Sequence, residues 1–195
     1  MNSTITVNKE PITIFAIIHS DVPASVRTSL YADHFQPFVS ELESFIERKV
    51  DVVFGKRAPY CDFDYKGEDA LRTVKRWEGM GGNYLSEMQA EGFKTNALTQ
   101  VILITKEQLN DSIAGIALVY PYSRKYAIAS LTRYLIVGHE VGHLLGATHE
   151  DSQTHFNGWW CETYMTPEPD SLKSNCYKYS PANRQNIKNY LATYD

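Results

Sequence analysis

The chain has 195 residues, a formal net charge of -4 and a pI near 5.9, and 43% of its residues are hydrophobic. This length and composition predict one globular domain that spans residues 1–195. The chain is slightly acidic and lacks the excess of basic residues that nucleic-acid binding requires, so we expect no nucleic-acid partner. The longest apolar stretches, at 12–18 and 113–120, are too short to cross a bilayer, so we expect no membrane span.

Periodic hydrophobic residues predict alternating strands and helices along the chain. We expect strands at 10–19, 50–54, 101–105, 113–120 and 126–130, and helices at 31–45, 68–78, 83–91, 131–145 and 181–191. Gly79, Gly81 and Gly82 are expected to form a turn between two of these helices, because glycine disfavours a helix interior. Residues 151–180 show little periodicity, so we expect cross-links and packing to order them.

A metal-binding pattern follows the last predicted strand. From His139 to His149 the sequence reads H-E-x-x-H-x-x-G-x-x-H. His139 and His143 are four residues apart, so one helix face presents both imidazoles to the same ion. Gly146 can take a positive φ, end the helix and turn the chain back, so that His149 becomes a third ligand. Glu140 lies beside the coordination position left for water, where it is placed for proton transfer.

Three nitrogen ligands with an open fourth position are typical of catalytic zinc sites, so the pattern predicts one bound Zn2+ ion. The remaining histidines occur singly, and a single histidine is more often a surface or hydrogen-bonded core residue. His19, His34 and His155 are therefore assigned no role.

The eleven residues match the zinc signature of the metzincin metalloproteases in full, and the chain resembles that family. Metzincins also have a methionine in a tight turn beneath the metal, and Met165 fits that position. Because Cys161 precedes Met165 and Cys176 follows it, the chain looks most like the adamalysin (reprolysin) branch. Two differences leave the branch open. Cys161 precedes the methionine by four residues, where Cys-x-Met is usual, and Glu150 stands directly after the third histidine, where adamalysins generally have Asp.

The resemblance implies an α/β (α+β) fold, with a twisted five-stranded mixed sheet and three main helices. A sheet-and-helix part of about 1–146 is expected to precede a small irregular C-terminal part of about 147–195. In such domains an extended peptide substrate pairs with an edge strand, which here corresponds to Gly115, Ile116, Ala117 and Leu118. An open strand edge supplies main-chain donors and acceptors regardless of sequence, which agrees with this expectation. A plain buried strand is the alternative, because short apolar runs are ambiguous.

The resemblance further implies a zinc-dependent endopeptidase whose partner is a protein or peptide substrate. Zinc lowers the pKa of its bound water toward about 7, and Glu140 takes that proton and returns it to the departing amine. Side chains between Tyr164 and Tyr177 are expected to wall the pocket for the substrate residue after the scissile bond. Trp159, Trp160, Tyr177 and Tyr179 either line that pocket or serve as packing.

A disulfide between Cys161 and Cys176 would close the loop around Met165 and stabilise it by about 3 kcal/mol. We expect this bridge, an unpaired structural Cys61, and an extracellular or periplasmic location. Residues 1–18 lack the pattern of a secretory signal. A monomer is favoured, and the sequence makes no prediction about calcium.

Two alternatives remain open at this point. In a gluzincin, a downstream glutamate such as Glu162 or Glu168 would replace His149 as third ligand. A zinc-stabilised binding or inhibitory module would keep the fold without turnover, although a merely structural site would be expected to fill its fourth position with protein.

Overall fold

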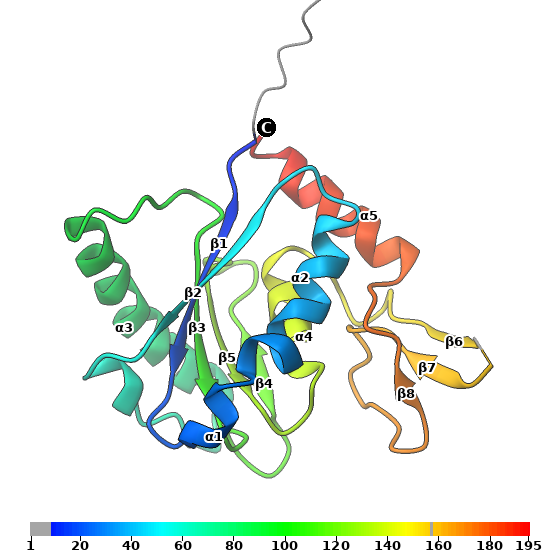
Figure 1. The fold of residues 1–195 in the computed structure, drawn as a ribbon, viewed down its shortest axis with the longest axis horizontal. Coiled ribbons are helices and arrows are strands. Elements are labelled where there is room, and N and C mark those ends of the chain that lie inside the picture. Colours follow the sequence, from blue (N-terminus) through cyan, green and yellow to red (C-terminus); the bar gives the residue numbers. More distant parts are fainter. Residues whose placement is uncertain (1–8, 157) are drawn as a thin grey trace, which may run out of the picture.

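The computed structural model describes residues 9–156 and 158–195, and residues 1–8 and 157 of the predicted domain lie outside this range (Figure 1). The strands of the main sheet are β1 (Ile12–Ile18), β2 (Val50–Gly55), β3 (Gln100–Thr105), β4 (Gly115–Ala117) and β5 (Tyr126–Ser130). The helices are α1 (Ala24–Arg27), α2 (Gln36–Glu43), α3 (Ala70–Ala90), α4 (Ile136–Leu144) and α5 (Pro181–Ala192). A π-helical turn at Tyr31–Phe35 and a 3-10 turn at Tyr60–Asp62 complete this part.

The main sheet has five strands in the order β2-β1-β3-β5-β4. Neighbouring strands are parallel except for β4, which pairs antiparallel with β5 and lies at one edge. The predicted five-stranded mixed sheet is therefore confirmed.

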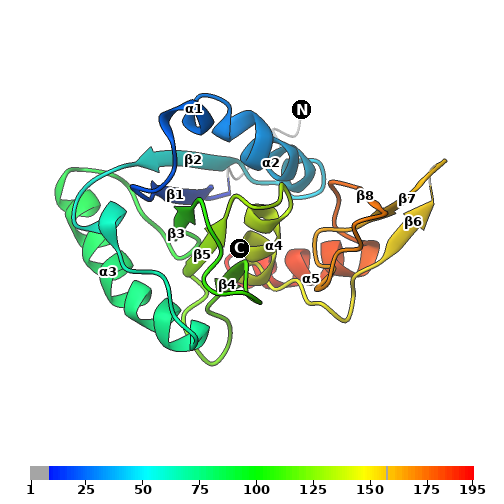
Figure 2. The same cartoon turned by 90° about the horizontal axis from the view of Figure 1, so that it is seen from below.

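Apolar residues cover both faces of this sheet. In β1, Ile14 and Ala16 belong to one buried cluster, whereas Phe15 and Ile17 belong to the other. Figures 1 and 2 show α3 over one face and α2 and α4 over the opposite face. Burial on both faces explains why the central strands read as continuous apolar runs.

The predicted turn at Gly79, Gly81 and Gly82 is wrong, because α3 runs without interruption over 21 residues. Asp69 caps the helix by accepting a hydrogen bond from the Arg72 amide. A Cβ atom at Gly81 would lie 2.7 Å from the Tyr126 ring, so glycine permits the close approach of α3 to β5. Packing against the sheet here overrides the low helix propensity of glycine.

Three further boundaries differ from the prediction. The expected helix at 31–45 begins with the π-helical turn, and α2 begins at Gln36 with Pro37 in its first turn, where a missing amide proton costs nothing. The helix with the histidines begins at Ile136 rather than at 131. The edge strand β4 covers only 115–117, although the Leu118 amide still donates to Tyr126 O at 2.9 Å.

The C-terminal part contains a second, three-stranded sheet of β6 (Thr154–Phe156), β7 (Trp160–Glu162) and β8 (Ser174–Asn175). These short strands add to the cross-links and packing that the sequence analysis expected to order this region. The predicted Cys161–Cys176 disulfide is present and joins residues 15 positions apart, while Cys61 is buried and unpaired.

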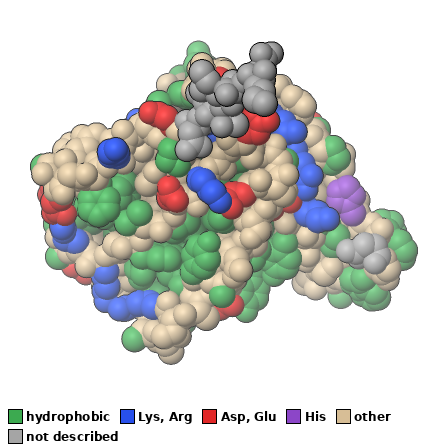
Figure 3. All heavy atoms as spheres, turned by 45° about the horizontal axis from the view of Figure 1, so that its top comes forward, with side chains coloured by type: hydrophobic (Ala, Val, Ile, Leu, Met, Phe, Trp, Pro, Cys, Tyr) green, Lys and Arg blue, Asp and Glu red, His purple; other side chains and the backbone are tan. Residues whose placement is uncertain are grey.

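Both basic and acidic side chains are present on the face that Figure 3 draws, together with hydrophobic ones. Within 9–156 and 158–195, no helix combines the length and the apolarity needed to cross a membrane.

Candidate metal and catalytic site

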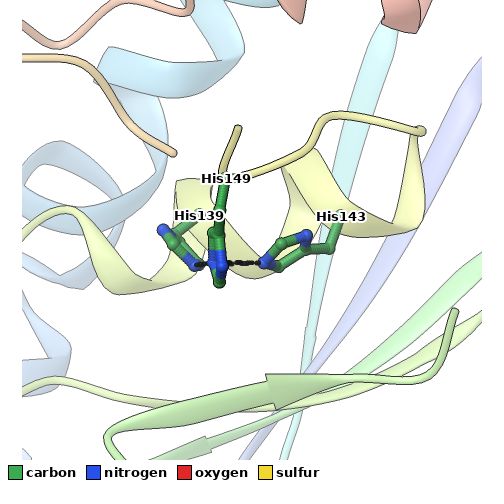
Figure 4. A group of neighbouring side chains, drawn as sticks. All are labelled: His139, His143 and His149. Atoms are coloured by element: carbon green, nitrogen blue, oxygen red, sulfur yellow. Dashed lines mark hydrogen bonds between the residues drawn. The ribbon is translucent and has the colours of Figure 1, made fainter. Parts of the chain in front are cut away.

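The three histidines of the motif meet at one point beside α4 (Figure 4). The Nε2 atoms of His139 and His143 are 3.1 Å apart, and His149 Nε2 lies 3.0 Å from each of them. Nitrogens about 2 Å from a shared zinc ion would form a triangle of roughly this size. Among the residues that the structure describes, these three make up the group of side chains that could hold a metal ion.

The second nitrogens of two imidazoles are occupied by main-chain carbonyls. His139 Nδ1 lies 2.7 Å from Tyr164 O, and His143 Nδ1 lies 3.2 Å from Ala147 O. These carbonyls accept the Nδ1 protons, so the Nε2 lone pairs of both rings face the common point. Converging lone pairs without a proton between them repel one another, whereas a cation at that point binds them. The donor set therefore fits a metal ion.

Burial keeps the two helical imidazoles neutral. Burial and the neighbouring His143 lower the pKa of His139 to about 3. Burial likewise lowers the pKa of His143 to about 4. Neutral imidazole is the form that binds a metal.

Gly146 directs the third histidine to this point. Its φ is +96°, which other residues rarely adopt, and the following Ala147 amide donates to Gly142 O at 2.9 Å. This hydrogen bond closes the end of α4 and reverses the chain. The chain reversal at Gly146 precedes His149, whose ring lies beside those of the other two histidines.

Glu140 is buried, with only 4% of its surface exposed, and burial raises its carboxyl pKa to about 8. Its Oε2 has no hydrogen-bond partner among the described residues. A buried polar atom without a partner is uncommon in folded proteins and often has a functional explanation. Glu140, His139 and His149 all line one cleft of about 610 Å³.

Met165 packs against the histidine helix α4. A Cβ atom at Gly142 would approach Met165 Sδ to 2.6 Å, and one at Gly138 would approach the Tyr164 ring to 2.7 Å. Tyr179 is fully buried there and donates from its hydroxyl to Gly138 O at 2.6 Å. Gly138 and Gly142 are thus needed for the close packing under α4, and the sequence interpretation missed both. Gly138, Gly142 and Gly146 follow one another at intervals of four residues, and this regular spacing was the available signal.

Of the aromatic residues considered for the pocket, Trp159 and Trp160 are 63% and 54% exposed and do not line this cleft. Tyr179 packs in the core, whereas Tyr164 and the following Pro167 and Glu168 do line the cleft.

Neither Glu162 nor Glu168 is placed to replace His149 as the third ligand. The Glu162 carboxylate pairs with Lys173 Nζ at 3.0 Å and accepts from the Asp170 amide at 2.9 Å, so it is already neutralised. Glu168 is exposed and lies on the cleft, outside the group of three histidines.

Gly115 of β4 leaves the space that the Glu140 carboxylate occupies. A Cβ atom at Gly115 would lie 2.5 Å from Glu140 Oε1. We expect Gly115→Ala to displace this carboxylate and to slow any reaction in which Glu140 transfers a proton by about tenfold or more, because general acid–base catalysis depends on position. Zinc content should stay at the wild-type level, since the histidines are untouched.

The measurement is turnover and zinc content of Gly115→Ala beside Gly79→Ala, whose added Cβ meets no atom within 4 Å. Wild-type turnover in Gly115→Ala would contradict the positional role of this glycine.

The fold and the three converging histidines together define an α/β protein with a candidate metal site. No protein-family model and no curated protein matches the chain. Among solved structures, metalloproteinase-II from Bacteroides fragilis is similar, with a TM-score of 0.61 and 18% sequence identity. The similarity covers 95% of this chain and 54% of that chain, so the present chain spans about half of that protein's length. At this identity the likeness establishes the fold.

Proposed function

We propose that this protein is a zinc-dependent endopeptidase of the metzincin type, nearest in its motifs to the adamalysin branch. One observation carries the proposal. Three imidazole Nε2 atoms converge within 3.1 Å of one another, and the buried, unpartnered carboxyl of Glu140 lines the same cleft. A metal that activates water and a carboxylate that moves its proton are the two parts that this chemistry requires.

In this proposal His139, His143 and His149 hold the zinc ion. When bound, zinc acidifies a water molecule and polarises the scissile carbonyl. Glu140 accepts a proton from the attacking water and delivers it to the departing amine, so one carboxyl serves both steps. Tyr164 O keeps the His139 ring in the orientation that presents Nε2 to the metal.

The free edge of β4 is proposed to bind the substrate backbone. Ala114 O accepts from the Ser130 amide and the Leu118 amide donates to Tyr126 O, so the main chain of these two residues faces β5. Because main-chain groups alternate along a strand, Gly115 and Ala117 present theirs to the open edge. These two residues, of the four predicted, are therefore proposed to pair with an extended peptide.

We further propose that the protein acts outside the cytoplasm and as a monomer. The Cys161–Cys176 disulfide supports an extracellular or periplasmic location, because such bonds persist in oxidising compartments.

A mass-spectrometric cleavage profile on a peptide library, with and without a chelator, tests the function. The proposal requires internal cleavage that stops on chelation and returns when zinc is restored. A chain that binds zinc and cleaves nothing would instead be a zinc-stabilised binding or inhibitory module, and chelator-resistant cleavage would exclude the zinc mechanism.

A further inference from the structure

The segment that carries the third histidine is held by α5, the C-terminal helix. Asn183 is completely buried, and its side-chain amide binds both main-chain groups of Thr148. Asn183 Oδ1 accepts from the Thr148 amide at 2.8 Å, and Asn183 Nδ2 donates to Thr148 O at 3.0 Å. Thr148 directly precedes His149.

These two hydrogen bonds fix two consecutive peptide planes. The first plane carries the Thr148 amide and Ala147 O, which are rigidly connected because the peptide bond is planar. Ala147 O is the acceptor that orients His143 through Nδ1. The second plane carries Thr148 O and the amide nitrogen of His149. The first peptide plane therefore connects Asn183 to His143, and the second connects Asn183 to His149.

Neighbouring contacts hold the same segment to α5. Asn186 Nδ2 donates to Asp151 Oδ2 at 2.6 Å, and the Ser180 hydroxyl donates to Asp151 O. The Ser180 side chain also caps α5 by accepting from the Asn183 amide at 3.1 Å. Residues 148–151 are thus held at both ends by the first two turns of the helix.

We propose that Asn183 is a positioning residue for the metal centre, which sets the orientation of His143 and His149 through the main chain of Thr148. This inference rests on the proposed function, because it assumes that the three histidines bind zinc. If Asn183 has this role, the geometry of the metal site depends on α5. This helix begins more than 30 residues after the motif, and its sequence matches no metal-binding pattern.

The test is zinc affinity, measured by competition with a chromophoric chelator. Asn183→Ala removes both hydrogen bonds, and we expect zinc affinity to fall about 10-fold to 100-fold, as for other residues that orient metal ligands. Asn183→Asp is nearly the same size and keeps the acceptor for the Thr148 amide but loses the donor to Thr148 O. This variant should retain the orientation of His143, and its zinc affinity should lie between those of Asn183→Ala and the wild type.

Two controls separate positioning from general destabilisation. Ile187→Ala removes buried side-chain volume one turn further along the same helix and leaves both hydrogen bonds between Asn183 and Thr148 in place. Asn189→Asp makes the same chemical change as Asn183→Asp at an exposed position of α5. Both should keep wild-type zinc affinity in the folded protein, even where Ile187→Ala lowers the melting temperature of the metal-free form.

An affinity within twofold of wild type in both Asn183 variants would overturn the inference, as would an equal loss in Ile187→Ala. In either case wild-type zinc binding would leave the proposed function intact. Failure of the wild-type chain to bind zinc at all would overturn the proposed function itself, and the inference with it.

Discussion

Glu140→Gln is expected to lower peptide hydrolysis by about two to four orders of magnitude, the usual contribution of a positioned general base or acid. The amide has the size of the carboxyl but accepts no proton from water. Zinc should remain bound, because Glu140 is not one of the three converging ligands. The measurement is the initial rate of cleavage of an unfolded protein substrate, with zinc content determined on the same sample.

Glu91→Gln is the matched control, since Glu91 follows the end of α3 and pairs with Arg57 at the surface. It should keep the wild-type rate. Undiminished turnover in the Glu140→Gln variant would contradict the proposed role of Glu140 and leave proton transfer to another group.

His143→Ala is expected to lower zinc affinity more than a hundredfold, a larger loss than that seen when only an orienting contact is removed. His143 Nε2 lies within 3.1 Å of both other Nε2 atoms, so its loss leaves two of three ligands. A ligand at 100 times its Kd stabilises the folded state by about 2.7 kcal/mol, and the variant should lose this stabilisation.

The measurement for His143→Ala is the shift of melting temperature on adding zinc, which is expected for the wild type and absent from the variant. His155→Ala, in β6, should respond to zinc as the wild type does. A full zinc-dependent shift in His143→Ala would place the metal elsewhere.

The sequence predicted the convergence of the three histidines because the relevant geometry is local. Residues four apart on a helix share a face, and a glycine that takes positive φ reverses the chain, so His139, His143 and His149 could be placed without knowledge of the remaining fold. The five strands were predicted from apolar runs, and their arrangement in one mixed sheet from the resemblance.

Contacts between distant segments were not predictable from such local rules. Gly81 reads as a helix breaker until Tyr126 is seen to occupy the space of its missing side chain. The close packing beneath α4 depends in the same way on the contact between Gly142 and Met165, which are distant in sequence. Asn183 gave no signal at all, because a single asparagine in a C-terminal helix is compatible with many roles.

The dependence of cleavage rate on bound zinc, measured by adding zinc to the metal-free chain, tests the central claim most directly. If one zinc ion binds at the three histidines, the cleavage rate should rise in proportion to added zinc up to one equivalent per chain and then stay constant. Cleavage that proceeds without zinc, or zinc binding at one equivalent without any cleavage, would contradict the account.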